Sequence, residues 1–433
     1  MSELSKSLNT WRGAALMLNI VIGAGLLALP GLAVQNAGHL AVYSWLVCAI
    51  VSLPLIGIFV LLGRRYPNAG GIAHFTGIAF GRPGYAAASL VFLGAVLFGL
   101  PSIALTGGHY LSVLTGASPH LMALLLLVLA TLGLLVPSAL SAQINTYLAF
   151  AILCTILFVL ISGWVLIGDA TTGTGGGVGL SPPDSLSDVA IIFAPFMIIF
   201  FAFTGWEVAA GLSEEFSNPK RDFPLAMIIS FVVILLIYIG IAVLAQKVPL
   251  EGYYETAFAR IASVALGLSA ERLVSILAAV IVLANLSGAI WAVSRLVFSL
   301  SREGYLPKQV QASKSGTPWV AVLITASALY LIVILDWFGF FGLGKMLALA
   351  GQNFIILYGA AAISLFVLTN SLAERLLALV ATLLVTALVI LQGVNPAYPS
   401  ALIIIGLLIG WASERRMKVN LGRTINQRPE FEA

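Results

Sequence analysis

Long uncharged stretches of apolar residues constrain this sequence more than any other feature. About twelve such stretches, each roughly 20 residues long, occupy most of the 433 residues. A bilayer core about 30 Å thick is crossed by about 20 residues of α-helix. Charged residues form only 9% of the chain, whereas about a quarter of the residues of a soluble domain are charged. The chain is therefore predicted to be an integral membrane protein.

The apolar stretches are predicted to be helices rather than strands of a barrel. They are continuously apolar over about twenty residues, whereas a transmembrane strand alternates over about ten. Charged residues and Pro or Gly clusters mark their ends. The twelve predicted spans cover residues 13–33, 39–62, 85–107, 120–139, 145–168, 189–211, 224–246, 272–297, 318–337, 344–368, 372–391 and 396–412.

The distribution of cations predicts the orientation of these spans. With a cytoplasmic N-terminus, 17 of the 21 Lys and Arg residues fall on the cytoplasmic side. Only Lys247, Arg260, Arg272 and Lys345 fall outside. This asymmetry follows the positive-inside rule, and an even number of spans returns the C-terminus to the cytoplasm. We expect a multi-pass membrane protein with both termini cytoplasmic and no cleaved signal peptide.

Glycines near the middle of spans one and six predict interrupted helices. Span one carries Gly23 and Gly25, and span six carries Gly205 followed by Glu207. A helix that only has to span avoids such residues, because they free backbone groups that lipid cannot satisfy. Each glycine taken alone is equally consistent with close helix packing. Their matched placement in two successive five-helix units favours the paired broken helices of an inverted-repeat transporter.

Interrupted helices predict a binding site made of backbone groups. Amides at the start of a half-helix attract a carboxylate, and carbonyls that have lost their helical partners accept hydrogen bonds from an ammonium group. The predicted carboxylate site around Gly23 comprises the amides of Ala24, Gly25 and Leu26. The predicted ammonium acceptors are the carbonyls of Val21, Ile22, Phe203 and Thr204, next to Gly205. A small zwitterion fits both sets.

Glu207 is the only acid predicted deep inside a span. An ionised carboxylate there costs at least about 2.5–3.5 kcal/mol unless it is paired or faces a cavity. Two interpretations follow. Glu207 either changes protonation during transport and couples it to protons, or stays hydrogen-bonded as a brace for the broken segments; the brace is favoured.

Five motifs resemble those of one transporter superfamily. They are GAGLL at 23–27, RYPNAGG at 65–71, FTGWE at 203–207, EFSNPKRDFP at 215–224 and SREGYLP at 301–307. Together they resemble the glycine-rich break, the sixth-helix signature and the cytoplasmic loop motifs of the amino acid–polyamine–organocation transporters. Residues 63–75 and 218–224 most resemble bacterial exporters of methionine and branched-chain amino acids.

The resemblance implies an all-α membrane fold with a five-plus-five inverted repeat in which helices one and six are broken. The implied organisation is a cytoplasmic segment 1–12, one transporter domain 13–412 and a basic cytoplasmic tail 413–433. Within the domain, repeat one covers about 13–168, repeat two about 189–368, and two trailing helices cover 372–412. By the same resemblance, Phe201 is the aromatic lid over the substrate.

The residue types predict neutral substrates. A cationic or anionic side chain would need a buried counter-charge beyond the backbone site, and the predicted pocket offers only apolar surface. We therefore expect alternating-access transport of methionine, leucine, isoleucine or valine, as efflux with proton antiport or exchange. Many proton-coupled members of the superfamily carry a lysine in span five near the position of Ile152, but span five of this chain has no lysine. Asn285 and Ser287 of span eight either supply oxygens to a cation or bond neighbouring helices.

Other functional classes receive little support. An importer or exchanger of broader range shares the same fold and stays open. A channel would need a repeated filter or a ring of charges, and a membrane-embedded enzyme would need a nucleophile with a base or metal ligands; neither pattern is present. No cofactor, metal or nucleic-acid partner is predicted. The expected partners are a small neutral amino acid, membrane lipid and protons, and the oligomeric state is left open.

Overall fold

The protein is helical throughout the part that the structure describes. A computed structural model describes residues 8–22, 25–68, 70–134, 154–166, 183–311, 318–391 and 397–426. These ranges contain an isolated backbone bridge between Leu8 and Phe216 but no β-strand. Nine of the described helices are long and apolar enough to cross a membrane, and the two shorter apolar helices Pro119–Gly133 and Cys154–Leu166 accompany them. The predicted all-α membrane fold is confirmed.

The first span is interrupted where its glycines predicted. Helix α1 (Thr10–Val21) begins behind Asn9, whose side chain accepts a hydrogen bond from the Arg12 amide. Helix α2 (Gly25–Ala37) begins after three intervening residues. Gly23 and Ala24 lie outside the described residues. The span therefore consists of two half-helices joined at mid-length.

The sixth span is divided at two places. Helix α7 (Leu186–Phe193) is followed by α8 (Phe196–Ala202), with Pro195 between them, and α8 is followed by α9 (Trp206–Gly211). The break between α8 and α9 was predicted from Gly205. The division at Pro195 was not predicted, although proline lacks the amide that a continuous helix needs there.

All but one of the remaining helices follow the predicted spans, with some differences in length. They are α3 (Ala41–Arg65), α4 (Gly71–Thr115), α5 (Pro119–Gly133), α10 (Asp222–Lys247), α11 (Ala257–Leu266), α12 (Leu268–Arg302), α13 (Trp319–Trp337), α14 (Leu343–Leu368), α15 (Leu372–Leu391) and α16 (Ala397–Asn426). Short 3-10 turns are η1 (Gly38–Leu40), η2 (Leu212–Glu215), η3 (Tyr254–Thr256) and η4 (Lys308–Gln311). Parts of the predicted spans 120–139 and 145–168 lie outside the described residues.

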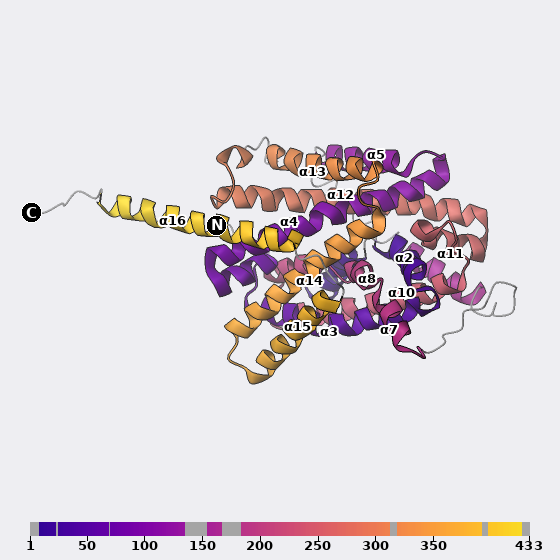
Figure 1. The fold of residues 1–433 in the computed structure, drawn as a ribbon, viewed down its shortest axis with the longest axis horizontal. Helices are drawn as coiled ribbons and strands as arrows, with labels where there is room; N and C mark the ends of the chain where they lie inside the picture. Colours follow the sequence, from indigo (N-terminus) through magenta and orange to yellow (C-terminus); the bar gives the residue numbers. More distant parts are fainter. Residues whose placement is uncertain are drawn as a thin grey trace, which may run out of the picture.

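Several helix ends differ from the sequence prediction. Helix α4 bends at Gly81, which has a left-handed φ of 71°, so a short helix precedes the predicted third span. Helix α11 forms in a loop for which no helix was predicted. Helix α16 continues through Asn426, well beyond the predicted end at residue 412, and projects away from the rest of the protein (Figure 1). Hydropathy detects only the apolar part of a helix. The polar continuation of α16 could therefore not be predicted from it.

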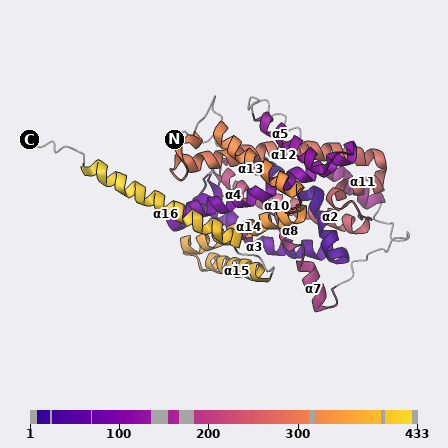
Figure 2. The ribbon, with the colours of Figure 1, turned by 45° about the horizontal axis from the view of Figure 1, so that its top comes forward.

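The broken helices lie in the interior of the helical array. Helix α4 packs against α5, α12, α13, α14 and α16, and α10 packs against α1, α2 and α3. Both views show α5, α12 and α13 together on one side, α3 on the other, and α8 and α14 between them (Figures 1 and 2). One large apolar core joins residues from these helices. The breaks are thus surrounded by protein, as unpaired backbone at membrane depth must be.

Candidate functional site

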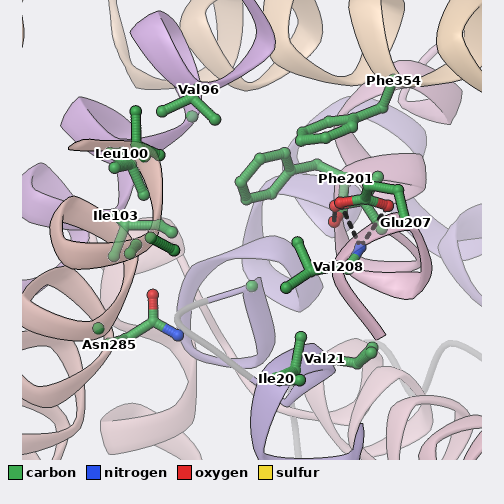
Figure 3. A pocket seen from close by; sticks show the side chains of 18 of the residues that line it. Ile20, Val21, Val96, Leu100, Ile103, Phe201, Glu207, Val208, Asn285 and Phe354 are labelled. Carbon is green, nitrogen blue, oxygen red and sulfur yellow. Dashed lines mark hydrogen bonds between the residues drawn. The ribbon is translucent and has the colours of Figure 1, made fainter. Parts of the chain in front are cut away.

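A cavity of about 340 Å³ lies where the two breaks face each other. Its described lining comes from α1 and α2, from α8 and α9, and from α4, α12 and α14. Cavities of this size, lined mainly by apolar groups with a few placed polar ones, are typical of small-molecule sites. Figure 3 shows Phe201, Glu207 and Val208 on one side and Leu100, Ile103 and Asn285 on the other.

The first break contributes Val21, Ile22 and Gly25 to the cavity. The Ile22 amide still donates to the Leu18 carbonyl at 2.8 Å, so α1 keeps its last helical bond. The Val21 carbonyl, predicted to be free, accepts a hydrogen bond of 3.1 Å from the Tyr238 hydroxyl. A carbonyl oxygen has two lone pairs, so Val21 can accept a second hydrogen bond besides the one from Tyr238.

The second break turns at Gly205. Its φ of 105° lies in the left-handed region, which an L-residue adopts at a cost of about 1–2 kcal/mol. The amides of Phe203 and Thr204 bond back to Phe200 and Phe201 at 2.9 and 3.2 Å. Helix α9 then restarts with the carbonyl of Gly205, which accepts from Ala209 at 2.9 Å. The chain therefore changes direction within three residues beside the cavity.

Glu207 is held by hydrogen bonds from two elements. Its carboxylate accepts from the Gly205 amide at 3.0 and 3.1 Å and from the Tyr358 hydroxyl of α14 at 2.6 Å. The side chain is buried yet lines the cavity. Among the described residues the hydrogen bonds of Glu207 thus go to its own span and to α14. Gly23 and Ala24 of span one lie outside those residues.

Phe201 lies beside Phe354 of α14, with ring centroids 6.1 Å apart. Both rings line the cavity and lie together in Figure 3. Gly99 of α4 makes this placement possible, because a Cβ there would lie 2.9 Å from a ring carbon of Phe201. Phe201, the predicted lid, thus faces the cavity and packs against Gly99.

The wall opposite the breaks is mostly apolar. Helix α4 supplies Val96, Leu100 and Ile103, and α12 supplies Ile281 together with small residues. Asn285 of α12 interrupts this wall and points its amide into the cavity (Figure 3). Apart from Glu207, the described lining contains no ionisable side chain.

The cavity is closed on the side of α2. The Tyr110 hydroxyl of α4 donates to the Leu27 carbonyl at 2.9 Å, and both residues are buried. Gly31 of α2 lies so close to the Tyr254 carbonyl of η3 that a Cβ would overlap it. On the side of α9, by contrast, Val208 lines the cavity and is 40% exposed. The structure is therefore open toward the ends of α9 and α12 and shut beyond α2.

Seven of the predicted site residues line the cavity: Val21, Ile22, Gly25, Phe201, Thr204, Gly205 and Glu207. Leu26 and Phe203 are buried in the packed layer behind it instead. Gly23 and Ala24 lie outside the described residues. The Phe203 ring packs 5.6 Å from that of Tyr238 and 6.0 Å from that of Trp45. Sequence reasoning missed Tyr358 and Phe354, since nothing local marks a partner that lies about 150 residues away.

Metal binding finds no support in the described part of the chain, where no three His, Cys, Asp or Glu side chains converge. The arrangement can instead hold a small molecule through main-chain groups at the breaks and through apolar contacts on the opposite wall.

Comparison with known proteins agrees with this geometry. Residues 8–412 match the profile of the amino acid permease family. The uncharacterized amino acid permease YecA of Bacillus subtilis is 29% identical over 87% of each chain. The L-methionine/branched-chain amino acid exporter YjeH of Escherichia coli is 30% identical, covering 69% of this chain and 71% of that one. The putrescine transporter PotE of Escherichia coli is 24% identical over 73% and 74% of the two chains.

Proposed function

This chain belongs to the amino acid permease family, and from that membership we propose that it exports neutral, mainly apolar amino acids by secondary active transport. The family consists of transporters, not enzymes. Membership in the amino acid–polyamine–organocation superfamily, implied by the five motifs, is confirmed. Amino-acid transport across a membrane is thus the established class of activity, and substrate, direction and coupling are the proposal.

The observation that carries the proposal is the cavity at the paired breaks. Helix α2 begins at Gly25, and Gly25, Val21 and Thr204 all line the cavity. The start of a helix attracts a carboxylate, and carbonyls beside a break accept from an ammonium group. The α-amino and α-carboxyl groups of an amino acid match this pair. Gly23 and Ala24 complete the proposed main-chain site together with Ile22 and Gly205, whereas Leu26 and Phe203, which do not line the cavity, are left out of it.

The wall of the cavity supports a neutral side chain. Val96, Leu100 and Ile103 offer apolar surface, which contributes about 25 cal/mol for each Å² removed from water. The described lining has no cation for an acidic side chain, and Glu207 is already engaged by Tyr358 and Gly205. Methionine, leucine, isoleucine and valine therefore fit best, in agreement with the substrates after which YjeH is named.

Alternating access is proposed as the mechanism. The bundle of spans one, two, six and seven (α1 with α2, α3, α8 with α9, and α10) rocks against the scaffold of spans three, four, eight and nine (α4, α5, α12 and α13). The cavity opens on the side of α9, where Val208 is exposed. With the N-terminus placed in the cytoplasm by the positive-inside rule, this state faces inward and is ready to load a substrate for export.

The same reasoning extends to the remaining organisation. We place the protein in a bacterial inner membrane with both termini cytoplasmic and with repeats at about 13–168 and 189–368. Glu207 is the group through which proton antiport would act, and substrate exchange without protons is the alternative mode.

The proposal is tested by transport in proteoliposomes. Purified full-length protein is reconstituted, and each of the twenty amino acids is tried as the unlabelled substrate in counterflow, with and without a pH gradient. We expect neutral aliphatic and thioether amino acids to accelerate uptake of labelled methionine from the opposite side. A channel shows no such acceleration. Selective counterflow by lysine or glutamate, or none by any amino acid, would overturn the proposal.

A further inference from the structure

We propose that Asn285 determines substrate specificity by forming a hydrogen bond with an acceptor atom near the end of the substrate side chain. The inference rests on the proposed function and deepens it, since it separates substrates of equal size within the neutral class. Its chemical consequence is a preference for a thioether over a hydrocarbon chain of the same shape.

The first support is the state of the polar side chains along the cavity. Thr204 donates its hydroxyl to the Phe201 carbonyl at 2.7 Å, and Glu207 accepts from Gly205 and Tyr358. Asn285 differs, because its amide forms no hydrogen bond with any residue in the described ranges. Of these three polar side chains, it alone keeps its hydrogen-bonding groups for a ligand.

The second support is that the ordinary role of such a residue is not fulfilled. An amide inside a transmembrane helix normally bonds a neighbouring helix, where the contact stabilises the packing. Asparagine is also a poorer helix former than the apolar residues around it. Asn285 lies within α12, between Ile281 and Gly288, and faces the cavity rather than a described partner (Figure 3). Packing therefore does not account for it.

The third support is the space beside it. The α12 face that carries Asn285 also presents Ala284, Gly288 and Ala289 to the cavity. A Cβ at Gly288 would meet no atom within 4 Å. Small residues on the same helical face leave room for an extended, unbranched side chain to lie along α12 and reach the amide.

The chemistry of the amide defines the ligand. Its NH₂ group donates two hydrogen bonds and its oxygen accepts, but it carries no charge with which to bind an ion. A thioether sulfur is a weak acceptor, so a methionine side chain can receive a hydrogen bond that norleucine, with CH₂ in place of sulfur, cannot. When norleucine binds, the Asn285 amide also loses its contact with water and gains no hydrogen bond in return, which weakens the binding of norleucine. Both effects favour methionine.

The experiment compares methionine with norleucine in proteoliposomes that contain the full-length protein. Counterflow of labelled methionine is inhibited by each unlabelled compound, and the ratio of half-inhibitory concentrations is measured. We expect the wild-type protein to prefer methionine by about 2- to 10-fold, the range of one neutral hydrogen bond. Asn285→Leu should bring the ratio close to one while norleucine is still recognised.

Two further variants keep the outcome decisive. Asn285→Ala removes the amide without adding bulk, in case leucine obstructs the cavity. Ser287→Ala, two residues away on α12, removes a polar group that does not line the cavity, since its hydroxyl donates to the Leu283 carbonyl at 2.8 Å, and should keep the wild-type ratio. A purely structural role for Asn285 would lower transport of both compounds together and leave the ratio unchanged.

The outcomes separate the two proposals. If the wild-type protein transports methionine but the ratio is one, or if Asn285→Ala keeps the wild-type preference, the role of Asn285 is wrong and the transport proposal stands. If the wild-type protein moves neither compound nor any other amino acid, the proposed function itself is wrong.

Discussion

Tyr110→Phe should shift the protein toward the state that opens on the side of α2. Tyr110 belongs to α4 of the scaffold, and its hydroxyl donates to the Leu27 carbonyl of α2, which belongs to the bundle. This bond therefore crosses the boundary at which the two bodies must separate.

The magnitude follows from the burial of the bond. Tyr110 is 0% exposed and Leu27 is 1% exposed, and their oxygens are 2.9 Å apart. The Leu27 carbonyl lies inside α2 and keeps its helical partner, so the loss is that of one ordinary hydrogen bond, about 0.5–1.5 kcal/mol. Because the loss applies only to the closed state, the population open on the side of α2 should rise by about 2- to 12-fold.

The assay is the labelling rate of one cysteine introduced behind the closure. The native thiols Cys48 and Cys154 are first replaced by alanine and serine, and Ala28→Cys is added beside Leu27, where the side chain is buried. A membrane-impermeant thiol reagent is applied to reconstituted protein. In Tyr110→Phe the labelling rate should rise by about 2- to 12-fold, because it follows the population that is open on the side of α2.

Tyr238→Phe provides the matched control. Tyr238 is also fully buried and donates its hydroxyl to a carbonyl of the first span, that of Val21, at 3.1 Å. Its helix α10 moves with α1 in the proposed bundle, so the bond persists in both states and its removal should leave the labelling rate unchanged. Equal rates in the two variants would refute the assignment of Tyr110 to a boundary between bodies.

Three further changes test the site. Gly25→Val should abolish substrate binding, because a Cβ there already lies 3.4 Å from the Ala202 Cα and a branched side chain crowds the start of α2; normal affinity in a direct binding assay would remove the backbone site. Gly205→Ala should lower the thermal unfolding temperature in detergent, since its φ of 105° costs an L-residue about 1–2 kcal/mol; Gly288→Ala, which meets no atom, is the stability control. Glu207→Gln should abolish transport with or without a pH gradient, because the amide NH₂ group that replaces one carboxylate oxygen would face the Gly205 amide, which is also a donor. Transport that survives in that variant but no longer responds to pH would show proton coupling instead of a brace.

The positions of the breaks could be predicted because glycine acts locally. Gly25 and Gly205 change the backbone where they stand, and the structure interrupts the helices at those residues. The ends of spans were predicted well where charge marks them, as at Asp222 and Lys247 of α10.

The partners of the breaks could not be predicted, because they depend on packing between distant segments. Tyr358 lies 151 positions from Glu207, and Tyr238 lies 217 positions from Val21. Nothing in the residues around a tyrosine shows which carboxylate or carbonyl its hydroxyl meets. The role of Phe201 as a lid was predicted by resemblance, but its contact with Gly99 depends on how α4 packs against α8 and could not be predicted.

The bond between Glu207 and the Gly205 amide has a consequence for the geometry of the cargo. Because the Gly205 amide already binds Glu207, the amides that remain for a substrate carboxylate in the proposed site are those at the start of α2. The carboxylate and ammonium groups of a zwitterion therefore cannot exchange positions. When the α-carboxylate and the α-ammonium group of an amino acid are each held at a fixed place, only one enantiomer can direct its side chain toward the α12 wall. Chiral discrimination is therefore built into the main chain, and we expect one enantiomer of each substrate to be carried in strong preference to the other.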